Sequence, residues 1–132
     1  MLMPYNLITP SDIKPKPDTY EQKAAAIVAN HFATDVRFVV RGSATTPDIY
    51  LVRQRQYWEI KHVCKNGKRT MANALRVADG QSENIIISLL RAKQMTSAQA
   101  IGRVKAFLKS GPTKIKRIVL ITKSHKIIDI KK

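Results

Sequence analysis

Residues 47–63 read PDIYLVRQRQYWEIKHV and indicate two β-strands. Segments 48–52 and 57–63 are rich in β-branched and aromatic residues, and four polar residues separate them. Two such segments joined by a short polar turn are typical of a β-hairpin. We expect the strands to pair so that residue 52 lies opposite residue 57. This register fixes which side chains share a face of the hairpin.

The expected hairpin has one charged face and one apolar face. Because side chains alternate along a strand, Asp48, Glu59 and Lys61 project from the same side. The register places Asp48 opposite Lys61 and Tyr50 opposite Glu59, at cross-strand separations of about 5 Å. The other face carries four apolar side chains that can pack on a helix: Ile49, Leu51, Trp58 and Ile60.

Two carboxylates and a lysine on one face suit a hard divalent cation. Mg²⁺ takes oxygen ligands, keeps several waters and is commonly held by one or two carboxylates together with substrate phosphates. Asp48 and Glu59 are therefore the candidate metal ligands, with Mg²⁺ expected and Mn²⁺ or Zn²⁺ as alternatives. Lys61 would neutralise charge or orient a nucleophile. A second interpretation stays open: a surface ion pair between Asp48 and Lys61, with Glu59 as a solvated strand residue.

A third carboxylate, Glu21, belongs to a helix that is predicted to begin at Thr19 and to end at Phe32 or Ala33. Thr19 and Gln22 fit a capping box at the start of this helix. On a helical wheel, Glu21 lies at the centre of the apolar stripe that should face the sheet. A carboxylate that faces inward needs a partner, so Glu21 is a candidate member of the acidic site. The alternative is that Glu21 stabilises the helix start through the helix dipole, wherever its side chain points.

Charge is distributed unevenly along the 132 residues, which carry 24 Lys and Arg against 9 Asp and Glu, a formal net charge of +15. Residues 1–46 hold five basic and four acidic side chains, and residues 47–132 hold nineteen basic and five acidic ones. Self-repulsion of this kind does not favour folding, so a polyanion, and nucleic acid above all, is the expected partner. A membrane surface is disfavoured because no basic amphipathic helix is evident. A merely basic, soluble surface is the alternative.

The length predicts one domain, and a single cysteine excludes an internal disulfide and favours a cytosolic setting. Four prolines in residues 1–18 indicate an extended leader, so the folded domain is expected at 19–132. Periodicity predicts the order α-β-β-β-α-β-α-β-β, which indicates an α/β fold with a central mixed sheet flanked by helices. The remaining helices are expected at 69–79 and 97–109, and the remaining strands at 36–40, 84–90, 115–122 and 126–130.

The spacing of Pro47-Asp48, ten further residues, and then Glu59-Ile60-Lys61 resembles the signature of PD-(D/E)xK nucleases. A closer resemblance covers residues 19–130: the chain is similar to the C-terminal tRNA-nuclease domains of contact-dependent growth-inhibition toxins of the CdiA type. The motifs that carry this resemblance occur in the same order: Glu21 on the first helix, TPDI at 46–49, WEIK at 58–61, KRT at 68–70 and QSENIII at 81–87.

The resemblance implies a restriction-endonuclease-like fold. It also implies a metal-dependent endonuclease that acts on nucleic acid, most often tRNA, and is held in check by an immunity protein. Carried over by position, Asp48 and Glu59 hold the metal and Lys61 is the catalytic lysine. Glu21 completes the acidic site, and Gln81 is an active-site polar residue at the edge of the sheet. The basic charge of the chain fits an acidic immunity partner as well as nucleic acid.

Four further residues are candidates for contact with nucleic acid. Arg69, Thr70 and Asn73 open the helix after the hairpin and could grip phosphate together with the helix N-terminus. Their alternative role is a solvated helix face. Tyr50 lies beside the acids and could stack on a base, whereas Trp58 is expected in the core.

We therefore predict a metal-dependent RNA endonuclease that acts in a bacterial cytoplasm, with tRNA favoured on the resemblance alone. Two alternatives stay open: a DNA nuclease such as a small Holliday-junction resolvase, and a non-catalytic nucleic-acid-binding protein. A metal-free ribonuclease that uses His31, His62 or His125 lacks a supporting constellation. His62 and Cys64 lie on the strand face away from the carboxylates, where packing suits them better than metal binding.

Overall fold

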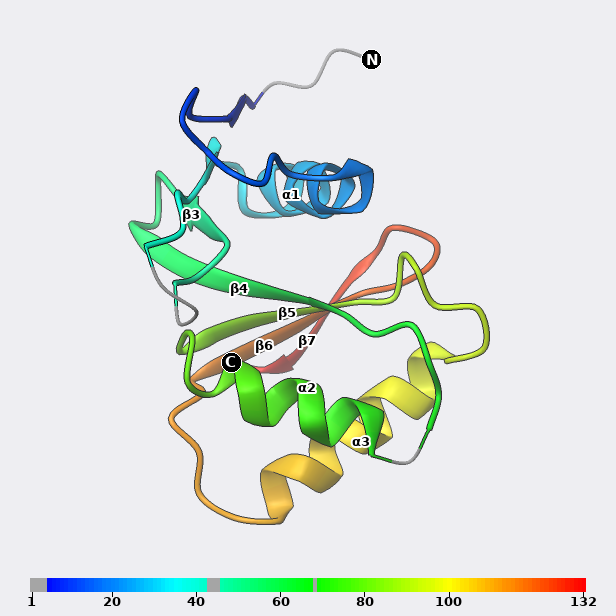
Figure 1. The fold of residues 1–132 in the computed structure, drawn as a ribbon. Helices are drawn as coiled ribbons and strands as arrows, with labels where there is room; N and C mark the ends of the chain where they lie inside the picture. Colours follow the sequence, from blue (N-terminus) through cyan, green and yellow to red (C-terminus); the bar gives the residue numbers. More distant parts are fainter. Residues whose placement is uncertain (1–4, 43–45, 68) are drawn as a thin grey trace.

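The computed structural model describes residues 5–42, 46–67 and 69–132. Over these residues it contains one mixed sheet of seven strands and three helices, which confirms the predicted α/β class (Figure 1). The helices are α1 (Thr19–Phe32), α2 (Thr70–Ala78) and α3 (Ser97–Lys109). The strands are β1 (Leu7–Ile8), β2 (Val36–Phe38), β3 (Ile49–Leu51), β4 (Gln56–His62), β5 (Asn84–Ser88), β6 (Arg117–Ile121) and β7 (Ile127–Lys131).

The strands lie side by side in chain order, from β1 to β7. Strands β2, β3 and β4 are antiparallel, and β4, β5 and β6 are parallel. Helices α2 and α3 make the two crossovers between the parallel strands and cover one face of the sheet, whereas α1 covers the other (Figure 1). None of the helices over the described residues is long and apolar enough to cross a membrane.

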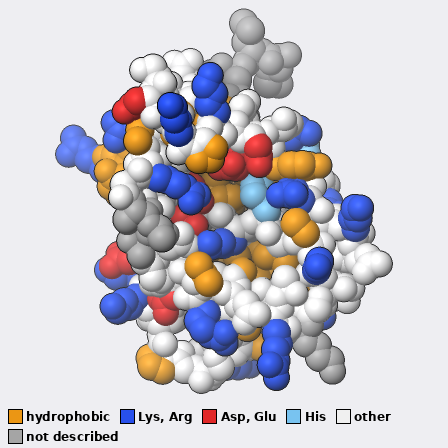
Figure 2. Space-filling model, in the orientation of Figure 1, with side chains coloured by type: hydrophobic (Ala, Val, Ile, Leu, Met, Phe, Trp, Pro, Cys, Tyr) orange, Lys and Arg blue, Asp and Glu red, His pale blue; other side chains and the backbone are white. Residues whose placement is uncertain are grey.

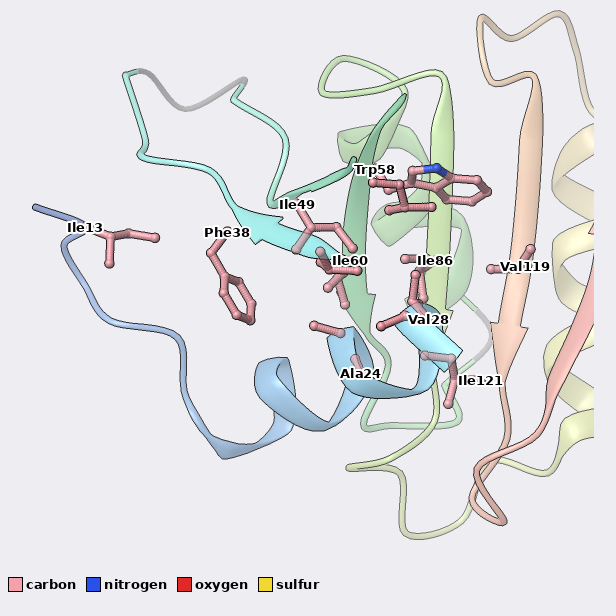
Figure 3. Close-up of a cluster of buried hydrophobic side chains, with 14 residues drawn as sticks. Ile13, Ala24, Val28, Phe38, Ile49, Trp58, Ile60, Ile86, Val119 and Ile121 are labelled. Carbon is pink, nitrogen blue, oxygen red and sulfur yellow. The ribbon is translucent and has the colours of Figure 1, made fainter. Parts of the chain in front are cut away.

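Each face of the sheet carries its own core. On the α1 face, the buried Ala24 and Val28 of the helix pack with Trp58, Ile60 and other strand residues (Figure 3). On the α2–α3 face the core includes Met71, Leu75, Val104, Ile85 and Ile87. Strand β5 reads NIIIS without alternation because its successive isoleucines fill the two cores in turn.

The start of α1 differs from the prediction by one residue. The capping box is formed by Asp18 and Glu21, not by Thr19 and Gln22. The Asp18 side chain accepts a hydrogen bond from the Glu21 backbone N–H (2.8 Å), and Glu21 Oε1 accepts one from the Asp18 N–H (3.4 Å). Aspartate is at least as good an N-cap as threonine, so the helix begins with the stronger of the two available boxes.

The segment expected as an extended leader contributes to the sheet. Leu7–Ile8 forms the edge strand β1, which pairs in parallel with β2, and Ile13 is buried in the core on the α1 face. Pro17 is also buried, directly before the N-cap of α1. This segment therefore packs along the same end of α1 that carries Glu21.

Candidate functional site

The hairpin of β3 and β4 has a different register from the predicted one. Tyr50 lies opposite Tyr57, and Ile49 lies opposite Trp58, so Asp48 lies level with Glu59 instead of opposite Lys61. The predicted pairing of residue 52 with residue 57 is therefore wrong by two residues.

The turn explains this shift. Residues 52–55 form the four-residue loop, which is closed by a hydrogen bond from the Arg55 N–H to the Leu51 carbonyl (2.8 Å). Arg55 adopts a left-handed conformation with φ 56°, which lets the chain reverse one residue earlier than expected. A shift of two residues keeps every side chain on its predicted face, because side chains alternate with a period of two. The structure therefore still brings Asp48, Glu59 and Lys61 to one side.

Asp48 is held at the point where the pairing of β3 with β4 ends. Pro47 before it has no N–H to continue the ladder. Asp48 Oδ2 takes the place of a backbone acceptor and receives the Ile60 N–H (2.9 Å), and Oδ1 pairs with Arg41 Nη2 (2.9 Å). The Asp48 side chain is only 8% exposed. Sequence reasoning missed Arg41, because its loop carries no motif that indicates a contact with β3.

Glu59 is the most deeply buried carboxylate of the site, with a side chain 2% exposed. Its Oε2 lies 3.1 Å from Lys61 Nζ, whereas its buried Oε1 has no hydrogen-bond partner among the described residues. Burial, and then the charge and contact of Asp48, raise the pKa of Glu59 to about 8, and Lys61 opposes this shift. On the neighbouring strand Ile85 pairs with Glu59, so apolar packing lies directly beside the carboxylate.

This arrangement fits a divalent cation. Two carboxylates in contact repel each other when both are ionised, and the unpaired Glu59 Oε1 needs a positive partner. Asp48 and Glu59 are the residues that could hold the ion. Over the described residues, no group of three or more His, Cys, Asp and Glu side chains is placed to bind a metal. Two protein carboxylates suit Mg²⁺, which completes its coordination with water and phosphate.

Glu21 lies at the margin of the site. It is half-buried, and this burial is the main cause of its raised pKa. The backbone hydrogen bond with Asp18 lowers the pKa, whereas the charges of Asp18 and Asp48 raise it. It lines a small pocket of about 50 Å³ that Arg41 and Asp48 also line. Its Oε1 accepts the Asp18 N–H at the start of α1, so this contact agrees with the alternative role in which Glu21 stabilises the helix start. Glu21 and Asp48 line the same pocket, but over the described residues no cluster of three carboxylates that could bind a metal is formed.

Gln81 lies in the turn between α2 and β5. The hydroxyl of its neighbour Ser82 donates to the carbonyl of Tyr57 (3.1 Å), and the Asn84 side chain donates to the same carbonyl (3.0 Å). Gln81 therefore lies near the start of β4, whereas Lys61 lies near its end.

The start of α2 carries the three predicted phosphate contacts. Arg69 is the N-cap residue and is exposed, and its side chain makes no capping hydrogen bond. Thr70 begins the helix, and Asn73 is exposed with its Oδ1 bonded to Arg76 Nη1 (2.9 Å). The helix starts after the loop that leaves β4, so its N-terminus lies toward the Lys61 end of that strand (Figure 1).

Two pairs of aromatic rings lie near Asp48, Glu59 and Lys61. Tyr50 packs against Tyr57, with ring centroids 4.7 Å apart. His62, at the end of β4, lies 6.3 Å from the Tyr20 ring, and both of its ring nitrogens are buried with no hydrogen-bond partner among the described residues. Burial lowers the pKa of His62, so the imidazole is neutral near pH 7. Figure 2 shows acidic side chains and a histidine in the hollowed centre of this face, surrounded by Lys and Arg.

Residues 45–127 match the family described as "Contact-dependent growth inhibition CdiA C-terminal domain". The chain belongs to this family. The matched region of the growth-inhibition domain contains Asp48, Glu59, Lys61 and Gln81, whereas Glu21 precedes it. This membership confirms the resemblance to the C-terminal domains of growth-inhibition toxins of the CdiA type.

A solved structure described as "CdiA-CT/CdiI toxin and immunity complex from Burkholderia pseudomallei" shares the fold, with a TM-score of 0.62 and 21% sequence identity. The alignment covers 96% of the present chain and 99% of that chain. No curated protein matches the growth-inhibition domain.

Proposed function

We propose that this domain is a toxin that hydrolyses phosphodiester bonds in RNA, with tRNA as the favoured substrate, in the cytoplasm of a bacterial target cell. The observation that supports this most is the buried Asp48–Glu59 pair, with an unsatisfied carboxylate oxygen, beside Lys61. Membership of a growth-inhibition family supports the toxic role. The net charge of +15 supports a nucleic-acid substrate.

Asp48 and Glu59 would hold a divalent ion, Mg²⁺ in the first place and Mn²⁺ or Zn²⁺ as alternatives. When bound, the ion would supply a Lewis acid for the phosphodiester and would lower the pKa of a water molecule. The Ile60 N–H and Arg41 fix one oxygen each of Asp48, so this carboxylate is oriented before substrate arrives. Preorganised groups of this kind need no rearrangement during the reaction.

Lys61 would act on the phosphate. Its ammonium lies against Glu59 and is about one-fifth exposed, so it can reach solvent and substrate from a partly desolvated position. A cation in such a position stabilises the negative charge that develops on phosphate oxygens, and it does so more strongly than in water. Lys61 can also orient a nucleophile at the same place.

The remaining predicted residues would position the substrate. Arg69, Thr70 and Asn73 offer a cationic side chain and polar groups at a helix N-terminus, which together attract phosphate. Tyr50 presents an aromatic ring on the same face as Asp48. Glu21 would add negative charge at the margin of the site, and Gln81 would be a polar contact near the start of β4.

An acidic immunity protein is the proposed protein partner. The structural neighbour from Burkholderia pseudomallei was solved as a toxin and immunity complex. The charge of +15 on the present chain would favour an acidic partner that covers the substrate-binding face.

One cleavage assay tests the proposed function. The protein is incubated with total tRNA, linear DNA and a four-way junction, each with Mg²⁺, with Mn²⁺ or with EDTA. We expect cleavage of tRNA only, which is lost in EDTA and in Glu59→Gln. The matched control is Asp12→Asn, which removes an exposed carboxylate far along the chain from the hairpin.

The other outcomes would replace the proposal. Cleavage confined to the junction would identify a resolvase. Tight, salt-sensitive binding without product from any substrate would identify a non-catalytic binding protein.

A further inference from the structure

A row of three side chains crosses the antiparallel part of the sheet. Arg37 on β2 lies opposite Tyr50 on β3, which lies opposite Tyr57 on β4. The Arg37 guanidinium is 5.0 Å from the centre of the Tyr50 ring, and the Tyr50 and Tyr57 rings are 4.7 Å apart. The guanidinium and the two rings, whose planes are tilted by 54°, therefore form a continuous row of contacts that supports Tyr57 from one side.

The outer part of Tyr57 faces solvent. The residue is 46% exposed, which makes it one of the most exposed large apolar side chains among the described residues. A tyrosine that served only to pack the hairpin would gain most by being covered. Tyr57 instead presents an exposed aromatic surface that contacts Tyr50 on one side.

Tyr57 forms one wall of a pocket of about 480 Å³ at the start of β4, β5 and β6. Arg55, Lys116 and Lys132 also line this pocket, and its one acidic lining residue, Glu83, pairs with Lys116 (3.3 Å). The pocket is therefore net positive, with an aromatic wall. These are the two components that bind an unpaired nucleotide: a ring for the base and cations for the phosphate.

The pocket lies next to the proposed catalytic residues Asp48, Glu59 and Lys61. Tyr57 precedes Glu59 by two residues on the same strand and therefore projects from the same face. Two residues of a strand span about 6.6 Å, which is of the order of one nucleotide along an extended strand. A nucleotide bound at Tyr57 would consequently place a neighbouring phosphodiester at Asp48, Glu59 and Lys61.

We propose that this pocket binds a single unpaired nucleotide next to the cleaved bond, with its base stacked on Tyr57 and its phosphate held by Arg55 and Lys132. The proposal rests on the proposed nuclease function and adds a requirement to it: the substrate must be single-stranded at this position. A base inside a duplex is already stacked on both sides and cannot lie on Tyr57 without leaving the helix.

The test separates this site from catalysis. All proteins carry Glu59→Gln so that no substrate is cut, and the ligand is a short single-stranded RNA containing the fluorescent base 2-aminopurine. Stacking on tyrosine changes the fluorescence of this base, so the readout reports base contact directly. The same RNA annealed to its complement is the second ligand.

We expect Tyr57→Ala to weaken binding of the single strand about tenfold or more and to abolish the fluorescence change, while binding of the duplex changes less than about twofold. Tyr57→Phe should keep both signals. Tyr57→Leu, which keeps an apolar neighbour for Tyr50 but has no aromatic face, should behave like Tyr57→Ala even where Tyr57→Ala is less stable. Val77→Ala, at an exposed apolar position on α2, is the control.

Lys132→Ala should weaken the binding of both ligands and reduce the slope of log affinity against log salt concentration by about one. Equal affinity and equal fluorescence change in Tyr57→Leu and Tyr57→Phe would overturn the proposal. If wild-type protein cuts no substrate and the Tyr57-dependent signal persists, the nuclease function fails while the nucleotide site stands.

Discussion

Strands β4 and β5 are parallel neighbours in one sheet, yet they meet opposite requirements. Every residue from Ile85 to Ser88 in β5 is fully buried, because helices cover both faces of that strand. On the α2–α3 face β4 carries Glu59 and Lys61, directly beside Ile85 and Ile87 of β5. Strand β5 therefore contributes apolar packing to both cores, whereas β4 places charged side chains at the edge of the core on the α2–α3 face.

This contrast explains the raised pKa of Glu59. Apolar packing beside Glu59 removes water from one side of the carboxylate, while Asp48 supplies a like charge on the other. The pKa of about 8 for Glu59 is the result. The fold therefore holds two neighbouring carboxylates that repel each other when both are ionised, and the cation proposed above would relieve this repulsion.

The largest expected effect is on β4. Glu59→Gln should lower the rate of tRNA cleavage at least about a thousandfold, because it removes a proposed ligand of the ion, while substrate affinity changes little. Single-turnover kinetics and binding measured in parallel check this, with Asp12→Asn as the control. A collapse of affinity with near-normal turnover would show that Glu59 binds substrate and takes no part in catalysis.

A substitution in the core of β5 should instead lower the stability of the protein. Ile86→Ala should lower the free energy of unfolding by about 2–5 kcal/mol, because it leaves a cavity in a core that is closed on all sides. The activity of the folded fraction should change little, since Ile86 faces α1, away from the carboxylates. Urea denaturation followed by a rate measurement tests both statements. The control is Val77→Ala, for which a change within about 0.5 kcal/mol is expected.

Lys61→Met should reduce cleavage about a hundred- to thousandfold, because it removes the cation proposed to stabilise the developing phosphate charge. Lys105→Met, an exposed lysine on α3, is the matched control. Metal affinity should not fall in Lys61→Met, since the ammonium repels the ion. Normal cleavage in this variant would remove Lys61 from the catalytic assignment.

Much of this architecture was predictable because it depends on local signals. Helix α3 spans Ser97–Lys109 as predicted, with Thr96 and Gln99 forming its capping box. The common face of Asp48, Glu59 and Lys61 follows from the period of two, which survives an even shift in register. Local sequence could not fix that register, because it depends on the left-handed conformation of Arg55.

Long-range contacts were not predictable. Arg41 meets Asp48 across a loop, and β1 is a two-residue strand whose partner lies far along the chain. The aromatic row of Arg37, Tyr50 and Tyr57 requires three strands in a known register. Sequence periodicity carries none of this information, so these features emerged only from the fold.

A smaller effect concerns pH. In EDTA, the folded protein keeps a proton on Glu59 up to about pH 8, whereas the unfolded chain releases it near 4.5. The contribution of Glu59 to stability is therefore fully present below about pH 4.5 and is lost as the pH rises toward 8. Glu59→Gln should remove this dependence and, at pH 8, raise the free energy of unfolding by roughly 1–2 kcal/mol relative to wild type. Identical pH profiles for the two proteins would contradict the origin assigned to this pKa shift.

We propose that the charged end of β4 holds one divalent cation between Asp48 and Glu59. Titration of the metal-free protein with Mn²⁺, followed by calorimetry or by loss of the free-ion electron paramagnetic resonance signal, measures this directly. We predict one Mn²⁺ bound by the wild-type chain and by Asp12→Asn, and affinity at least about tenfold weaker in Asp48→Asn and in Glu59→Gln. Binding of wild-type strength in the double variant Asp48→Asn/Glu59→Gln would show that these two carboxylates do not hold the ion.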